Sequence, residues 1–185
     1  VSPESPEGMG DDCSVLDCES NKKQLITTDS LSYGQHFDSS IRAEDAGAKL
    51  IKRNLSDIAA MGGTPGPALL NLLCGPDLSI EWLEGFIQGI RQTCEHYGVK
   101  IAGGDVSGLR EGQFSAVLTQ TGYTAEPILR RGAKEGDTIY VTGSLGGSIL
   151  KKHYAFEPRI AEGRWLADSN VCSSMMDLTD GLAKD

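Results

Sequence analysis

Six short acidic segments recur along the chain, mostly where an apolar run ends, and they constrain the fold more than any other feature. They lie at 10–12, 27–29, 54–57 and 103–105, and at Asp177 and Asp180. Two unit charges about 4 Å apart interact by roughly 4 kcal/mol at an effective dielectric near 20. Carboxylates gathered in one cleft would therefore repel one another strongly unless cations lay among them. The pattern predicts a protein that binds metal ions and, through them, the phosphates of a nucleotide.

The bulk composition narrows the class of protein. With 185 residues, the chain can form one good core or two small domains. Its net charge of −9 and the absence of a basic stripe argue against a nucleic-acid backbone as the main partner. No apolar run approaches the length of a membrane span, and the start does not resemble a signal peptide. The five cysteines form no Cys-x-x-Cys pair, so we expect reduced thiols in a cytoplasmic protein.

Hydrophobic periodicity predicts the first elements. A short β-type run at 24–28 ends at Asp29, and apolar residues at helical spacing predict a helix over 43–61. Two glycines at 62–63 end that helix, and 68–73 reads as a buried strand.

A second helix and two strands complete the first part. Ser79 is the expected N-cap of the helix, and Gly98 ends it. A strand at 99–102 then breaks into 103–105, and 114–122 is a longer strand.

The composition changes near residue 125, where we expect a domain boundary. We therefore expect two α+β or α/β domains, a complete one at 1–125 and a partial one at 126–185. The elements expected in the second part are a strand at 138–142, a helix after the Gly-rich turn 143–147, a helix at 158–168, a strand at 171–176 and a helix starting at Thr179.

Each acidic segment has an ordinary structural explanation as well as a functional one. Asp57 falls at the edge of the apolar face of its helix, where it is either a solvated flank or a metal ligand. The residues 27–29 fit an Asx-turn as well as a set of hard oxygen ligands. The glycines at 103–105 fit a plain turn as well as a phosphate-binding loop, and no P-loop motif occurs. His36 stands alone, which by itself favours no catalytic role.

The order and spacing of these segments resemble the thiamine-monophosphate kinase family, within the superfamily of aminoimidazole ribonucleotide synthetase and selenophosphate synthetase. The matching motifs are GMGDDC (8–13), TTDSL…HF (27–37), NLSDIAAMGG (54–63), GGD (103–105), RRGAKEGDTIYVTG (130–143) and MDLTDGL (176–182). The long match at 54–63 is specific.

The resemblance implies an ATP- and Mg²⁺-dependent transfer of a phosphoryl group to thiamine monophosphate, giving thiamine diphosphate, by a homodimer. It also implies an α+β fold, with a mixed sheet and flanking helices in the N-terminal domain and a partial α/β domain after it. The implied metal ligands are Asp12, Thr27, Thr28, Asp29, Asp57, Asp105, Asp177 and Asp180. The implied contacts to ATP are Gly104, Asp105, Arg130 and Thr179, with Tyr97 near the nucleotide. His36 falls on a position that contacts thiamine monophosphate.

Two departures from the family pattern keep other interpretations open. Thr179 stands where the family usually has Ser, and the chain ends at Asp185 whereas the family continues through a C-terminal domain. One alternative is a truncated, non-catalytic Mg-nucleotide-binding module. Another is a superfamily member that acts on a purine precursor, although the motif wording of those enzymes is absent.

Overall fold

The computed structural model describes residues 10–18, 21–150 and 152–185, so residues 1–9, which include the start of the motif at 8–13, lie outside the described residues. The described chain contains a five-stranded sheet with the order β1-β2-β5-β3-β4. β3 and β4 are parallel, and the other neighbours are antiparallel. The strands are β1 (Ser14–Asp17), β2 (Lys23–Ser32), β3 (Thr64–Cys74), β4 (Ile101–Gly108) and β5 (Phe114–Thr124).

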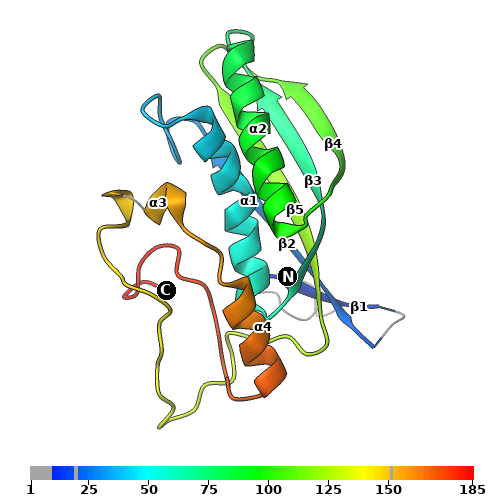
Figure 1. The fold of residues 1–185 in the computed structure, drawn as a ribbon, viewed down its shortest axis with the longest axis vertical. Helices are drawn as coiled ribbons and strands as arrows, with labels where there is room; N and C mark the ends of the chain where they lie inside the picture. The colour runs from blue at the N-terminus through cyan, green and yellow to red at the C-terminus, as the bar shows by residue number, and fades with distance from the viewer. Residues whose placement is uncertain (1–9, 19–20, 151) are drawn as a thin grey trace.

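Two long helices, α1 (Ala43–Ala60) and α2 (Ile80–Tyr97), lie side by side on one face of the sheet (Figure 1). They are followed in the second part by a 3-10 turn (Ser148–Leu150), by α3 (Lys152–Ala155) and by α4 (Ile160–Ser169). The predicted mixed sheet with flanking helices is confirmed. Within the described ranges, no helix has the length and apolar character needed to cross a membrane.

The two long helices begin and end where local sequence signals predict. The Ser79 hydroxyl accepts the backbone N–H of Trp82 (3.3 Å), and Gly98 ends α2 in the left-handed conformation at φ 69°. α1 ends just before Gly62, which also has a φ of 69°. A residue with a Cβ is strained in this conformation, so both glycines act as helix stops.

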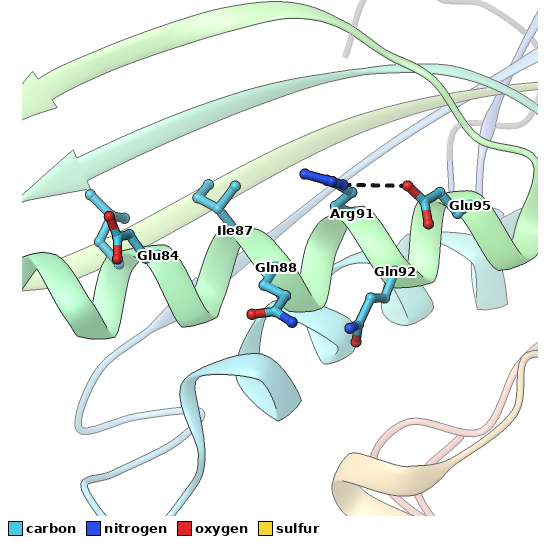
Figure 2. Close-up of a pocket in the computed structure, with 7 residues that line it drawn as sticks. Glu84, Ile87, Gln88, Arg91, Gln92 and Glu95 are labelled. Atoms are coloured by element: carbon cyan, nitrogen blue, oxygen red, sulfur yellow. Dashed lines mark hydrogen bonds and ion pairs between the residues drawn. The ribbon is translucent and has the colours of Figure 1, made fainter.

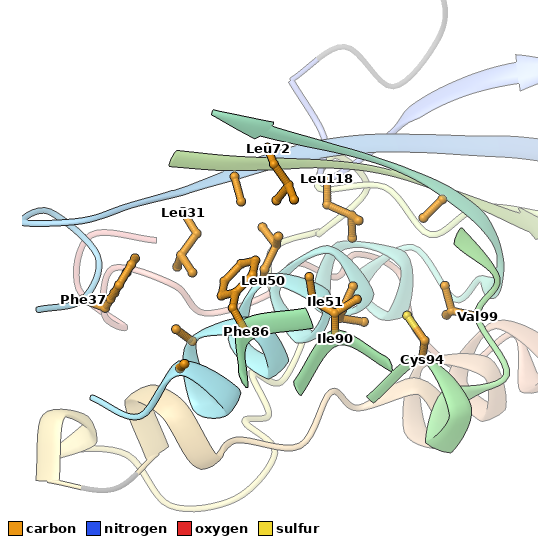
Figure 3. Packing of buried hydrophobic residues seen from close by; sticks show 14 of the residues in the cluster. Leu31, Phe37, Leu50, Ile51, Leu72, Phe86, Ile90, Cys94, Val99 and Leu118 are labelled. Atoms are coloured by element: carbon orange, nitrogen blue, oxygen red, sulfur yellow. The ribbon is translucent and has the colours of Figure 1, made fainter. Parts of the chain in front are cut away.

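The apolar face of α1 fills the main core. Leu50 and Ile51 are fully buried, and they belong to one cluster with Phe86 of α2 and Leu118 of β5 (Figure 3). Burying each such side chain contributes roughly 1.5–3 kcal/mol. Asn54 is fully buried among them, and its Nδ2 donates to the carbonyl oxygen of Leu50 (3.0 Å).

Glycines allow α1 and α2 to approach each other with their backbones nearly in contact. A Cβ on Gly47 of α1 would lie 2.1 Å from the carbonyl oxygen of Phe86 in α2. In the reverse direction, a Cβ on Gly89 would lie 2.0 Å from the carbonyl oxygen of Glu44. Since both obstacles are backbone atoms, the two glycines fix the distance between the helices.

All four predicted strands of the sheet extend beyond the predicted residues, and β2 and β4 run furthest past their predicted ends. β2 continues to Ser32 because β5 pairs with it along its whole length, so Asp29 lies within the strand and not at its end. β4 continues through 103–105 because β3 remains paired with it as far as Gly108. The predicted ends at Asp29 and at 102 were therefore wrong, since pairing with a neighbouring strand overrides local propensity.

The strands predicted at 138–142 and 171–176 were also wrong. A strand needs a neighbour for its N–H and C=O groups, and neither segment pairs with a strand in the described part of the chain. Ile139 and Tyr140 are 86% and 87% exposed. Their β-type composition therefore has no partner here.

The helices of the second part are only partly as expected. The one predicted at 158–168 is confirmed as α4, and the Gly-rich turn at 143–147 leads into a 3-10 turn and the short α3. The helix predicted from Thr179 is replaced by a turn, in which the Asp185 carboxylate accepts the N–H of Thr179 (2.9 Å). The domain boundary near residue 125 stays a prediction.

We expect Gly89→Ala to lower the free energy of unfolding by about 2 kcal/mol or more, because the new methyl group would overlap the backbone of α1. The same change at an unconstrained helical position would instead stabilise by about 1 kcal/mol. Urea denaturation measures the difference, with Gln88→Ala on the exposed side of α2 as the control. A Gly89→Ala protein as stable as Gln88→Ala would contradict the close contact.

Candidate metal site

Three aspartates from distant parts of the chain converge at one end of α1. Asp12 lies just before β1, Asp57 lies in the last turn of α1, and Asp177 lies in the segment after α4. One ligand oxygen from each carboxylate lies within 4.8 Å of the other two. This group, Asp12, Asp57 and Asp177, is called the carboxylate cluster below.

Hydroxyl groups hold two members of the carboxylate cluster. The Thr27 hydroxyl, on β2, donates to Oδ2 of Asp57 at 2.5 Å. Ser56, the neighbour of Asp57 on α1, donates from its hydroxyl to Oδ2 of Asp177 at 2.8 Å. Because the donors lie on a strand and a helix, the orientation of both carboxylates is fixed by the folded core.

Arg130 holds the third member. Its guanidinium donates to both carboxylate oxygens of Asp12, from Nη2 at 2.8 Å and from Nε at 3.2 Å. The Asp12 side chain is 1% exposed, so this two-pronged contact compensates a buried charge. The backbone N–H of Arg130 also donates to Asp11. One arginine therefore balances only one of the three carboxylates.

The pKa values of Asp57 and Asp177 are raised, in part by the negative charge that Arg130 does not balance. Burial, together with the neighbouring carboxylates, raises the pKa of Asp57 to about 8, although the Thr27 hydrogen bond favours the charged form. Burial and the nearby Asp12 likewise raise the pKa of Asp177 to about 7, against the Ser56 hydrogen bond. Asp57 also lies at a helix C-terminus, where the dipole disfavours negative charge. The cluster therefore favours either protons or a cation.

An apolar layer beneath the cluster explains this desolvation. It contains Cys13, Ile58 and Met61, which pack together and are each at most 2% exposed. Burial raises the pKa of the Cys13 thiol, and the adjacent carboxylates raise it further. All five cysteines of the chain are free.

The donor set fits Mg²⁺. The ion prefers hard oxygen ligands and is usually held by one or two carboxylates plus water and substrate phosphates. The carboxylate cluster offers such oxygens within 4.8 Å of one another, with the Thr27 hydroxyl beside them.

Thr28 and Asp29, also predicted as ligands, point to opposite faces of the sheet. Asp29 pairs with the buried Leu118 on the helix-covered face, and its carboxylate accepts a bond from Arg53 of α1 at 3.0 Å. Thr28 faces the other side, where its hydroxyl lies 3.1 Å from that of Thr119. The Thr28 hydroxyl is therefore turned away from the cluster.

The predicted nucleotide residues on β4 and α2 are not brought to the cluster. Asp105 is exposed on the edge strand and accepts the hydroxyl of Ser107. A Cβ on Gly104 would lie 1.7 Å from the carbonyl oxygen of Leu70, so close strand packing already requires glycine there. Tyr97 donates its hydroxyl to Glu157.

Other predicted residues lie elsewhere as well. Asp180 is exposed and pairs with Lys184, while Thr179 lies in the turn closed by Asp185. His36 lies in the loop after β2, where its Nδ1 accepts the N–H of Ser32 at 3.0 Å. Among the predicted residues, Asp12, Thr27, Asp57, Asp177 and Arg130 are the ones that meet.

Sequence reasoning missed Ser56, Arg53 and Lys49, which all lie on α1 and all make polar contacts near the predicted residues. A signal was present, since Lys49, Arg53 and Asp57 are spaced four residues apart and so share one face of the helix.

A hollow of about 540 Å³ lies elsewhere, on the outer side of α2 (Figure 2). Its lining includes Glu84 and the ion pair between Arg91 and Glu95 (3.4 Å). None of its residues belongs to the carboxylate cluster. The donor chemistry, and not the hollow, therefore marks the candidate site.

In the metal-free protein, Asp57 should lower the free energy of unfolding as the pH rises from about 4 to about 8. The reason is that the unfolded chain releases the Asp57 proton near pH 3.8, whereas the native state keeps it until about pH 8. Without metal, Asp57→Asn should therefore be more stable than the wild type at pH 8, by at least about 1 kcal/mol. At pH 4 the two proteins should be nearly equal. Urea denaturation in EDTA at both pH values measures this.

Asp45→Asn is the matched control, since Asp45 is an exposed aspartate at the other end of α1. Its stability should follow that of the wild type between pH 4 and pH 8. If Asp57→Asn also followed the wild type, the idea that burial of Asp57 opposes its charge would be wrong.

The chain is similar in sequence and in fold to known thiamine-monophosphate kinases. A thiamine-monophosphate kinase of Rhodopirellula baltica is 37% identical, covering 99% of this chain and 60% of its own length. The crystal structure of thiamine monophosphate kinase from Aquifex aeolicus superposes with a TM-score of 0.84 and 30% identity, over 92% of this chain and 63% of that one. A structure described as AaThiL complexed with AMPPCP and TMP superposes with a TM-score of 0.87 and 28% identity, over 96% of this chain and 62% of that one.

The chain spans about 60% of the length of the curated relatives it matches. The model of the family described as AIR synthase related protein, N-terminal domain, matches residues 10–124. The chain therefore belongs to the AIR synthase related protein family, and its similar sequences include thiamine-monophosphate kinases.

Proposed function

We propose that the protein transfers the γ-phosphoryl group of ATP to thiamine monophosphate and forms thiamine diphosphate, with Mg²⁺ held by the carboxylate cluster. The convergence of Asp12, Asp57 and Asp177 is the observation that carries the proposal. The similarity to thiamine-monophosphate kinases along nearly the whole chain supports the choice of substrate. The relative described with AMPPCP and TMP supports a site that accepts a nucleotide analogue and a second ligand together.

The chemistry asks mainly for positioning. The acceptor is a phosphate, which is already a nucleophile at neutral pH, so no strong general base is needed. Bound Mg²⁺ would supply positive charge against the phosphate oxygens. The chain's own contribution is to keep the carboxylates oriented, through Thr27, Ser56 and Arg130.

The roles of the other predicted residues are part of the proposal. For Thr28, the main-chain carbonyl is the group proposed as a ligand, because its hydroxyl faces away from the cluster. The remaining proposed metal ligands are Thr27, Asp29, Asp105 and Asp180. The proposed nucleotide contacts are Gly104, Asp105, Arg130, Thr179 and Tyr97, and His36 is the proposed contact to thiamine monophosphate. The cytoplasmic location stays a prediction.

Asp57→Asn should lower the formation of thiamine diphosphate by at least about 100-fold, because it removes a charged ligand from the metal site. The measurement is transfer of labelled phosphate from ATP, with thiamine monophosphate as acceptor and Asp45→Asn as the control. Millimolar Mg²⁺ with ATP should also raise the melting temperature of the wild type more than that of Asp57→Asn.

Unchanged turnover in Asp57→Asn would remove Asp57 from the metal site. If the wild type were stabilised by Mg-ATP but formed no thiamine diphosphate, a non-catalytic binding module would be the better interpretation.

We also propose that two copies pair through the sheet face opposite α1 and α2. Leu69 of β3 lies on this face and is 50% exposed, beside the polar Asn71. The resemblance to the family implies that N-terminal domains pair across their sheets, and Leu69 gives this face an exposed apolar side chain.

Leu69→Asp should therefore shift the protein from dimer to monomer in light scattering coupled to size-exclusion chromatography. Ile80→Asp is the control, because Ile80 is 67% exposed but lies at the start of α2. A wild type that is monomeric at micromolar concentration, or an unaffected Leu69→Asp dimer, would contradict the pairing surface.

A further inference from the structure

A buried lysine near His36 has no acidic partner. Lys49 of α1 is 4% exposed. Its Nζ donates to the main-chain carbonyl of His36 (3.1 Å), lies 2.8 Å from Nε2 of His153, and stands 4.5 Å from the ring centre of Tyr154. No carboxylate pairs with it within the described ranges. Burying an ammonium without an acidic partner costs free energy, and an apolar side chain would fill the same space without that cost. The contacts of Lys49 therefore need an explanation.

The shared target of these contacts is His36. Its carbonyl accepts a second bond, from the Tyr154 hydroxyl at 3.2 Å, and its backbone N–H donates to the carbonyl of Ser32 at 3.0 Å. The Ser32 N–H in turn donates to Nδ1 of the His36 ring at 3.0 Å. Both the main chain and the ring of His36 are thus fixed.

This arrangement selects one form of the imidazole. Because Nδ1 accepts a hydrogen bond, the proton of the neutral ring lies on Nε2. Burial and the nearby Arg53 and Lys49 lower the pKa of His36, which favours the neutral ring. In the described part of the chain, no hydrogen bond occupies Nε2, and the residue is half-buried. The Nε2–H is therefore a donor that has no hydrogen-bond partner among the described residues.

The two groups that hold the His36 carbonyl come from different parts of the chain. Lys49 lies on α1, and Tyr154 lies on α3, beyond residue 125. The orientation of His36 therefore depends on the second part being docked against the first. Lys49 also lies two helical turns before Asp57, so it connects this loop to the same helix that carries the carboxylate cluster.

We propose that Lys49 and Tyr154 are positioning residues, which hold His36 so that its Nε2–H donates a hydrogen bond to the phosphoryl acceptor. The inference rests on the proposed function. The ligand that receives this hydrogen bond is a phosphate ester whose heteroaromatic ring carries hydrogen-bond acceptor atoms, as that of thiamine monophosphate does. Lys49 and Tyr154 themselves need not touch it.

Lys49→Met and Tyr154→Phe test the proposal, since each removes one hydrogen bond to the His36 carbonyl while keeping most of the side-chain volume. Each should raise the KM for thiamine monophosphate about fivefold, the usual value of one hydrogen bond. The kcat and the KM for ATP should change less than twofold. In a His36→Ala background, the same substitutions should leave the KM unchanged, which a merely structural role would not predict.

Matched controls exist for both substitutions. Tyr140→Phe removes the hydroxyl of a tyrosine that is 87% exposed, and Lys100→Met removes an exposed lysine just before β4. Neither control should change the KM for thiamine monophosphate. Effects of Lys49→Met and Tyr154→Phe that persisted undiminished without the His36 ring would overturn the positioning role.

The ¹⁵N chemical shifts of the His36 ring give a readout independent of activity. The wild type should show the Nε2–H form, and both variants should show a mixture of forms. If the wild type formed no thiamine diphosphate but behaved in this way, the positioning would stand and the proposed kinase function would fall. If the ring form were the same in the wild type and both variants, the positioning would be wrong even in an active kinase.

Discussion

The near-contact of helix backbones around α1 is the constraint on which the rest of the structure depends. On one side, Gly47 and Gly89 bring α1 and α2 together. On the other side, a Cβ on Gly163 of α4 would lie 2.2 Å from the carbonyl oxygen of Ala59 at the end of α1. α4 is therefore held against the turn of α1 that carries Asp57, and the segment after α4 carries Asp177 to it. Small residues in two interfaces thus bring the acidic groups together.

This packing places charge where the protein interior least favours it. The carboxylate cluster lies over Cys13, Ile58 and Met61, and only Asp12 has an arginine partner. Replacing Asp57 by a neutral residue should make the metal-free fold more stable at pH 8, so this carboxylate does not serve the stability of the fold alone. A site that binds a divalent cation and phosphates gains from the same feature, because desolvated carboxylates interact more strongly with a cation.

The sequence predicted the helices better than the strands, for a physical reason. A helix satisfies its own hydrogen bonds, so periodicity, the Ser79 cap and the Gly98 stop were enough to define α2. A strand depends on a neighbour that local sequence does not reveal. Asp29 was therefore expected at a strand end but lies within β2, and 138–142 has β-type residues but no partner within the described ranges.

The candidate site divides in the same way. The motif order predicted that Asp12, Asp57 and Asp177 belong to one site, and the structure brings them together. The motif alone could not show which side chains of 27–29 face the carboxylate cluster. The sheet determines this, because neighbouring residues of a strand point to opposite faces. Thr27 therefore reaches Asp57, whereas the Thr28 hydroxyl turns away. Gly104 was predicted to belong to a phosphate-binding loop. In the structure its close contact with the backbone of Leu70 already requires a glycine, so the residue type alone does not indicate phosphate binding.

The polar face of α1 joins these features into one arrangement. Lys49, Arg53 and Asp57 follow each other at four-residue spacing, and they contact the His36 loop, Asp29 and Thr27 in that order. As the residue numbers rise along the helix, those of the partners fall, so α1 runs antiparallel to β2. The side chains on this face change from positive at Lys49 and Arg53 to acidic at Asp57. Because one helix face contacts both Thr27 beside the carboxylate cluster and the His36 loop, the packing of α1 against β2 fixes these two parts of the structure relative to each other.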